Sequence, residues 1–282
     1  MVLRGLTFPP PDKQMEPTLN NKRTNLFIVL SGIFLTNAVV AEIIGVKIFS
    51  AEGTFGLPPA QIHLFGDFVL DFNLTAGAVI WPVVFITTDI INEYFGKQGV
   101  KRISYMTAGF IAYVFLVIYL VTLLDPAAFW LDVNGTDSEG HPFNINYAFK
   151  VIFRQGLGII IGSLVAFLIG QLLDVYVFHQ LRKVTGSRMI WLRATGSTLV
   201  SQFIDSFVVL GIAFYVLAPE GGRWSLSQLA AVGTINYIYK FSVAILLTPL
   251  LYVAHYFIDR YLGKKDAEAL IEDAAAKSKG FF

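Results

Sequence analysis

The chain has 282 residues, of which 55% are hydrophobic and 15% charged, against about 25% charged residues in a typical soluble domain. The formal net charge of +1 gives no electrostatic reason to expect a nucleic-acid partner. The absence of cysteine excludes disulfides, thiolate metal sites and cysteine nucleophiles.

The apolar residues are concentrated in six blocks, each close to the roughly 20 residues that a helix needs to cross a bilayer. We therefore predict an all-α, polytopic membrane protein with one transmembrane domain at residues 25–260. No signal-peptide core is evident, so residues 1–24 are expected to form a tail and the first span to direct insertion. Residues 261–282 have helical propensity and mixed charge, which predicts a surface helix or a frayed end. The predicted spans are residues 25–49, 68–91, 103–124, 151–178, 194–217 and 229–258.

Lysine and arginine gather on one side of this predicted topology. The two tails, the connection between spans two and three and the connection between spans four and five hold 16 of the 21 basic residues. Because cytoplasmic loops are rich in Lys and Arg, both termini are predicted to be cytoplasmic. The 16 residues are Arg4, Lys13, Lys22, Arg23, Lys97, Lys101, Arg102, Arg182, Lys183, Arg188, Arg193, Arg260, Lys264, Lys265, Lys277 and Lys279.

Opposite charges lie deep in two neighbouring spans. Asp205 of span five and Lys240 of span six each lie about 16 Å from the predicted start of their span, at 1.5 Å per residue. Their matched depth predicts an ion pair. Asn37 of span one is about 18 Å deep and lies at the same level. A purely structural pair is the alternative, although burying a pair brings little stability by itself.

A polar stripe leads to Asp205 along span five. Thr198, Gln202 and Asp205 are spaced i, i+4, i+7 and therefore share one helix face, which Ser197 and Ser201 border. The two serines are equally typical of hydrogen bonds that hold membrane helices together.

A second polar cluster approaches the predicted cytoplasmic ends of spans two and four. Asp89 and Glu93 share a face at i, i+4 and Asn92 lies beside them, while Gln171 and Asp174 come from span four. The alternative role for these acids is pairing at the membrane surface, for which the basic candidates are Lys97, Arg102 and Arg182.

Four further residues stand out in spans one and two. Glu42 lies in the outer half of span one, far from water, whereas Lys47 is expected to extend its amine to the interface. Trp81 offers a ring that can stack on a flat ligand, with core filling as the alternative. Pro82 predicts a bend that frees backbone carbonyls for a site.

The motifs of several enzyme and cofactor classes are absent. The sequence contains neither a GxxxxGK[ST] phosphate loop nor an HExxH zinc motif, so ATP hydrolysis by this chain is not expected. The four histidines are scattered without metal-ligand spacing, and no Ser–His pair indicates a protease. We therefore expect no metal, no nucleotide cofactor and no enzymatic activity.

These polar segments resemble the queuosine-precursor transporter family, also called the vitamin uptake transporter family, over about residues 25–260. The resemblance implies a six-span protein of the bacterial inner membrane that imports 7-deazaguanine bases, the queuosine precursors preQ0 and preQ1. The tail and the large outer loop lie outside the shared motifs. These motifs are WPVVFITTDIINEYFGK (81–97), GQLLDVYVFHQLR (170–182), STLVSQFIDSFVVLGIAF (197–214) and YIYK (237–240).

The ligand that the resemblance implies has N–H and amino donors on one edge and a carbonyl acceptor nearby. Carboxylates suit the donors, amides suit the remaining polar atoms, and aromatic rings suit the flat bicycle. The expected substrate-binding residues are Asn37, Glu42, Trp81, Asp89, Asn92, Glu93, Gln171, Asp174, Thr198, Gln202, Asp205, Asn236 and Lys240.

Two transport mechanisms fit these residues. One is a secondary transporter that works by alternating access, with Asp89, Glu93 or Asp205 as the proton carrier of a coupled version. The other is the substrate-binding membrane component of an ATP-driven vitamin importer. A membrane enzyme or an inert scaffold is disfavoured, because no catalytic constellation is present and charges lie at the midplane. The expected partners are the 7-deazaguanine and the lipid bilayer, and a homo-oligomer is left open.

Overall fold

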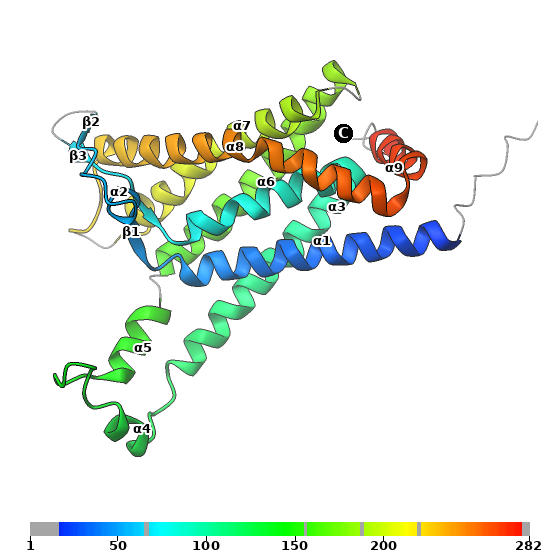
Figure 1. The fold of residues 1–282 in the computed structure, drawn as a ribbon. Coiled ribbons are helices and arrows are strands. Elements are labelled where there is room, and N and C mark those ends of the chain that lie inside the picture. Colours follow the sequence, from blue (N-terminus) through cyan, green and yellow to red (C-terminus); the bar gives the residue numbers. More distant parts are fainter. Residues whose placement is uncertain (1–16, 65–67, 155–156, 187–188, 219–220, 278–282) are drawn as a thin grey trace, which may run out of the picture.

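The computed structural model describes residues 17–64, 68–154, 157–186, 189–218 and 221–277 (Figure 1). Within them, five helical segments are long and apolar enough to cross a membrane, which confirms the all-α, multi-pass architecture. The helices are α1 (Pro17–Ile44), α2 (Ala51–Thr54), α3 (Gly77–Val121), α4 (Ala128–Val133), α5 (Ile145–Phe153), α6 (Leu157–Thr185), α7 (Ile190–Gly211), α8 (Leu226–Leu262) and α9 (Lys264–Lys277).

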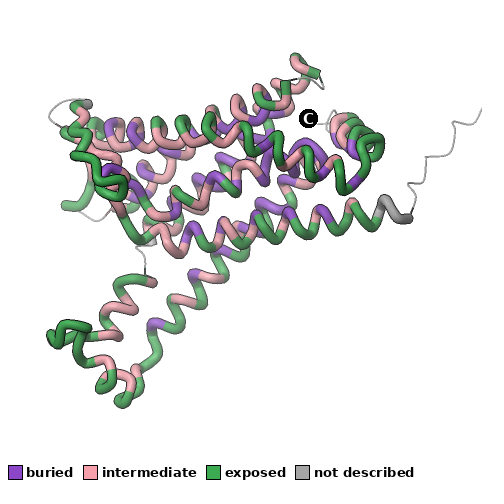
Figure 2. Tube along the Cα trace, in the orientation of Figure 1, coloured by how far each residue is buried: buried purple, intermediate pink, exposed green. Residues whose placement is uncertain are grey.

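The outside of the bundle is apolar. Figure 2 shows buried residues recurring on the faces that the long helices turn toward one another, with exposed residues outside. Large apolar side chains such as Val29, Tyr113 and Leu246 are exposed there. Exposed apolar surface of this extent is typical of a lipid-facing wall and not of a soluble monomer.

Helix α3 contains both the second and the third predicted spans. It runs for 45 residues, continues through Pro82, and leaves helical geometry at Gly96, where φ is 67° and ψ is −173°. Glycine adopts this conformation without the steric cost that other residues meet. Figure 1 shows the two halves of α3 leaving this bend in different directions. The second and third predicted spans therefore follow one another within α3, on either side of the kink at Gly96.

The predicted end of span one and the predicted start of span two, on either side of the loop between them, are wrong. Helix α1 begins at Pro17, inside the predicted tail, and ends at Ile44 instead of residue 49. Strand β1 (Ile48–Ser50) pairs antiparallel with β4 (Asn73–Thr75), so α3 begins only at Gly77. A second hairpin joins β2 (Ile62–Leu64) to β3 (Phe68–Leu70). Backbone pairing in these strands satisfies polar groups that an unfinished helix end would expose. Residues 1–16 of the predicted tail lie outside the described residues.

Glu52 organises the loop that contains these strands. Its Oε1 accepts hydrogen bonds from the backbone amides of Phe72 at 2.7 Å and Ala60 at 3.4 Å. Ser50 donates to its Oε2 at 3.1 Å. The bond from Phe72 is the main reason that the pKa of Glu52 lies below its usual value. An ionised carboxylate therefore links β1 and β4 to the turn between them.

Close backbone approaches hold the long helices together. A methyl group added at Gly77 of α3 would lie 2.4 Å from the carbonyl oxygen of Ala41 in α1. A methyl group at Gly162 of α6 would lie 3.0 Å from the carbonyl oxygen of Val209 in α7. Small residues at helix crossings are the usual basis of packing in membranes, where no hydrophobic force drives helices together.

The two ends of the bundle differ in composition. In Figure 1 the start of α1, the bend of α3, the α6–α7 connection and α9 lie at one end, whereas the strands, α4 and α5 lie at the other. The first end, here called the basic end, contains Arg23, Lys97, Lys101, Lys183 and Lys264. The second is called the strand end. Helix α9 packs against α3 and buries Ala267, Leu270 and Ala274.

Candidate functional site

A cavity of about 410 Å³ lies between α1, α3, α6, α7 and α8, and is called the main cavity below. It reaches Ile48 of β1 and Thr75 of β4, and therefore extends to the strand end. Small-molecule sites commonly have volumes of about 300–1,000 Å³. Its polar lining includes six of the predicted substrate-binding residues, Glu42, Gln171, Gln202, Asp205, Asn236 and Lys240.

The predicted pair of Asp205 and Lys240 is present in this cavity. The Lys240 Nζ donates to Asp205 Oδ2, and the two side chains are 18% and 20% exposed. They come from neighbouring helices α7 and α8, at the matched depth that residue counting predicts. Because both side chains face the cavity, either can exchange its partner for the polar edge of a ligand.

Aromatic rings form one wall of the main cavity. Trp81 stacks on Phe85 of the same helix with ring centroids 6.0 Å apart, and it meets Phe167 of α6 at 5.8 Å. All three residues line the cavity. Trp81 thus packs against aromatic neighbours in the bundle and also borders the cavity.

Glu42 lies across the cavity on α1 and is 8% exposed. Ser163 of α6 donates to its Oε2 at 2.9 Å. Ser163 also lines the cavity, although no motif or spacing singles it out. Gln202 lies on α7 with its Oε1 buried and without a hydrogen-bond partner among the described residues. An unpartnered buried acceptor is unusual in proteins and is suited to a ligand's N–H group.

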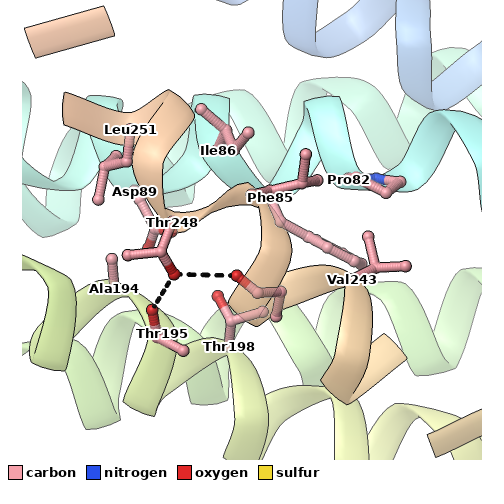
Figure 3. Close-up of a pocket in the computed structure, with 12 residues that line it drawn as sticks. Pro82, Phe85, Ile86, Asp89, Ala194, Thr195, Thr198, Val243, Thr248 and Leu251 are labelled. Carbon is pink, nitrogen blue, oxygen red and sulfur yellow. Dashed lines mark hydrogen bonds between the residues drawn. The ribbon is translucent and has the colours of Figure 1, made fainter. Parts of the chain in front are cut away.

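Asp89 lies one helical turn beyond Phe85, about 6 Å further toward the basic end. It borders a small cavity of about 30 Å³ between α3, α7 and α8. Figure 3 shows Asp89, Thr195, Thr198 and Thr248 around this cavity. Phe85 lines both cavities.

Asp174 of α6 lies at the level of Asp89, and the two acids form what is called the carboxyl pair below. Thr198 lines the small cavity together with Asp89 and also bonds Asp174, which brings the two acids to one part of the bundle. Thr198 and Ser201 of α7 donate to Asp174 Oδ1 at 3.5 and 3.4 Å. On the side of the main cavity, Thr88 donates to Gln171 Oε1 at 3.2 Å. Hydroxyl groups therefore surround the pair.

Glu93 lies one further turn along α3 and forms an ion cluster with two arginines. Its Oε1 accepts from Arg193 at 2.9 Å and its Oε2 from Arg182 at 3.4 Å. Arg193 is fully buried and Arg182 also donates to the carbonyl of Ile271 in α9. Of the expected partners for Glu93, Arg182 is confirmed. The cluster ties α3, α6, α7 and α9 together at the basic end.

Four predicted site residues line neither cavity: Glu93 and Asp174, which are described above, and Asn37 and Asn92. Asn37 donates its amide to the carbonyl of Ile33 in its own helix at 2.8 Å. Asn92 is fully buried and its Oδ1 lies 3.1 Å from His179 Nε2. Neither residue lines the two cavities, so their predicted contact with substrate lacks a geometric basis.

Sequence reasoning missed several residues that the site uses. Arg193 was assigned only to the cytoplasmic charge that orients the chain, and His179 and Phe167 were given no role. Spacing offers a signal for Phe167, because Phe167, Gln171, Asp174, Phe178 and Arg182 recur every three or four positions on α6. The described residues contain no group of three or more acidic or histidine side chains that could hold a metal ion.

Comparison with known proteins identifies relatives over most of the chain. The family model described as "Putative vitamin uptake transporter" matches residues 75–254. A "Probable queuosine precursor transporter" of Bacillus subtilis (strain 168) is 31% identical over 186 residues, which are 65% of this chain and 73% of the relative. The "Queuosine precursor transporter" of Escherichia coli (strain K12) is 27% identical over 204 residues, 72% of this chain and 82% of the relative.

A further relative, the "Probable queuosine precursor transporter" of Haemophilus influenzae (strain ATCC 51907 / DSM 11121 / KW20 / Rd), is 28% identical over 177 residues, 62% of this chain and 66% of the relative. No solved structure matches the chain. The family match covers more than half of the sequence and includes Trp81, Asp89, Asp174, Asp205 and Lys240. The chain therefore belongs to the vitamin uptake transporter family and is a multi-pass membrane transporter, not an enzyme.

Proposed function

We propose that the chain imports 7-deazaguanine queuosine precursors across the bacterial inner membrane by alternating access. The observation that carries the proposal is the main cavity, in which an ion pair, three amides and an aromatic wall surround a volume fit for a small base. The names of the relatives supply the substrate class. Proton coupling is part of the proposal, since buried carboxylates commonly relay protons in membranes.

The chemistry of the base matches this lining. Asp205 accepts the N–H and amino donors on the edge of the ring, and Lys240 donates to the carbonyl. Trp81 and Phe167 stack on the bicycle, where base–aromatic stacking is worth about 1–3 kcal/mol. Gln202 and Asn236 complete the polar contacts, and Glu42 attracts the aminomethyl group of a cationic precursor.

The proposed orientation places the basic end in the cytoplasm. Lysines and arginines near the ends of α1, α6 and α8 favour it through the positive-inside rule. In this orientation each half of α3 crosses the membrane once, before and after Gly96, which makes six crossings and leaves both termini inside. The main cavity then extends to the outer surface.

The structure fits the outward-facing stage of the transport cycle. On the side of the basic end, Phe85 lines both the main cavity and the small cavity that Asp89 borders. The ion cluster of Glu93, Arg182 and Arg193 then joins four helices at the basic end. Inward opening requires this cluster to separate while the strand end closes over the ligand.

Uptake by the chain alone tests the proposal. Proteoliposomes that contain only the purified protein, and no ATPase, should accumulate a radiolabelled 7-deazaguanine base, and Asp205→Asn should abolish uptake. Vesicles that bind the base but accumulate it only after an ATPase is added would instead support the importer-component mechanism. Transport at the wild-type rate by Asp205→Asn would contradict the proposal that the main cavity binds the substrate.

A further inference from the structure

Two buried carboxyl groups lie between the main cavity and the ion cluster without a cation. Asp89 is 7% exposed and Asp174 is 4% exposed. Asp89 Oδ1 and Asp174 Oδ2 are both buried and lack a hydrogen-bond partner among the described residues. No ion pair joins either acid to a Lys, Arg or His in the described part of the chain.

The other acids of the bundle have partners. Asp205 is paired with Lys240, and Glu93 with two arginines. Asp259 accepts a hydrogen bond from the Tyr94 hydroxyl at 2.8 Å. Glu42 is hydrogen-bonded to Ser163 and lies in the wall of the main cavity. The carboxyl pair is therefore the place where charge is least compensated.

Two ionised carboxylates cannot remain in this position at an acceptable cost. A charge buried inside a membrane-spanning bundle is costly, and a second like charge beside it costs more. One proton shared by the two groups removes one charge and supplies a donor between them. The unpartnered oxygens Asp89 Oδ1 and Asp174 Oδ2 are the atoms available to hold it.

The surroundings favour a proton over a metal ion. The described residues offer no group of three or more acidic or histidine ligands here. The residues of α7 and α8 that line the small cavity are uncharged, among them Thr195, Thr198 and Thr248. Glu93 follows on α3 and pairs with Arg182 and Arg193, and His179 of α6 contacts Asn92. Neither arginine forms an ion pair with Asp89 or Asp174, so the need for a proton remains.

Resting on the proposed function, we infer that Asp89 and Asp174 form one proton-binding site that couples transport to a proton gradient, separate from the Asp205–Lys240 substrate pair. Its position suits both directions of access. Gln171, bonded to Thr88, connects the level of the pair to the main cavity, and Asp89 borders the small cavity on the other side. The proton enters from the main cavity and leaves after the ion cluster opens.

Proteoliposomes with an entrapped pH-sensitive dye test the inference. Two readouts are compared: exchange of labelled base between preloaded vesicles and medium, and accumulation with proton influx under an imposed pH gradient. Asp89→Asn and Asp174→Asn should keep exchange and lose both proton influx and gradient-driven accumulation. Asp259→Asn is the matched control, since Asn still accepts the hydrogen bond from Tyr94, and it should keep all activities.

The outcomes separate the two proposals. Wild-type vesicles that fail to exchange the base would overturn the proposed function together with the inference. Wild-type vesicles that exchange the base without proton movement, or that accumulate it on a sodium gradient instead, would overturn the inference alone. The inference alone would also be overturned if Asp89→Asn and Asp174→Asn took up protons at the wild-type rate. It would be overturned as well if only Glu42→Gln lost proton coupling.

A labelling experiment on the wild-type protein covers the case in which the variants do not fold. Hydrophobic carbodiimides react with protonated carboxyl groups inside membranes, and mass spectrometry locates the adduct. The adduct should lie on Asp89 or Asp174 and should diminish as the pH is raised. An adduct found on Glu42 or Asp205, with Asp89 and Asp174 unmodified, would overturn the inference.

Discussion

Replacing Glu93 by glutamine should open the basic end of the bundle. Glu93 is 2% exposed and accepts from Arg193 at 2.9 Å and from Arg182 at 3.4 Å. Removing one partner of a buried ion pair costs about 3–5 kcal/mol, because the other charge remains buried. Gln keeps an acceptor oxygen, so the lower bound of about 3 kcal/mol applies. If the cluster exists only in the inward-closed state, the equilibrium shifts roughly a hundredfold, since about 1.4 kcal/mol is tenfold.

The absence of cysteine from the chain makes this shift measurable with a single introduced thiol. Thr248→Cys places the thiol in the small cavity, where an impermeant reagent added to inverted vesicles should react slowly. Adding Glu93→Gln should accelerate the reaction by roughly a hundredfold, from the same free energy. Asp273→Asn is the control, because its pairs with Lys277 and Arg23 are partly exposed and each contributes less than about 1 kcal/mol. Equal reaction rates with and without Glu93→Gln would refute the closing role of the cluster.

Three further predictions concern the pair, the bend and the outer loop. Asp205→Asn should weaken binding of the base tenfold to a hundredfold, as measured by titration, because a charge-assisted hydrogen bond contributes about 1.5–3 kcal/mol. Lys240→Ala should destabilise the protein more when it is made alone than when it is combined with Asp205→Asn. Equal or lower stability of the double variant would contradict the pairing. Gly96→Ala should lower the unfolding free energy by about 1–3 kcal/mol, because Gly96 has a positive φ that alanine adopts only with strain. Gly109→Ala is the control and should not lower it, because a methyl group at Gly109 would meet open space. The folded pKa of Glu52 is depressed, so its contribution to stability is present at pH values above its unfolded pKa and is lost as the pH falls below about 4. Below that pH, hydrogen exchange of the Phe72 amide should accelerate relative to exchange of amides in α3. An unchanged ratio of the two exchange rates would contradict this prediction.

Depth along a helix was predictable from the sequence, whereas rotation about the helix axis was not. Asp205 and Lys240 met because 1.5 Å per residue fixes depth in any continuous helix. Asn37 has a similar predicted depth but turns away from the cavity and bonds its own backbone. In a soluble protein the polar face of a helix reports its rotation. Lipid-facing and core-facing positions are both apolar here, so that signal is lost.

The ends of the helices were also poorly predicted from the sequence. Span one was predicted to end at residue 49 and span two to begin at residue 68, but the pairing of Ile48 with Thr75 places part of both segments in strands. Arg193 has two sequence interpretations, a topological charge at a span end or a buried partner, and only packing against Glu93 distinguishes them. The break between spans two and three was expected as a loop, and a single glycine, Gly96, supplies it instead.

The central claim is that the main cavity holds the substrate while it faces the outside. Protection of an introduced thiol tests it most directly. Asn236→Cys lines the cavity on α8, and Val253→Cys, 48% exposed on the same helix, is its control. In right-side-out vesicles, a 7-deazaguanine base should slow the reaction of Asn236→Cys with an impermeant reagent and leave Val253→Cys unchanged. Reaction of Asn236→Cys at the same rate with and without saturating base would contradict the account.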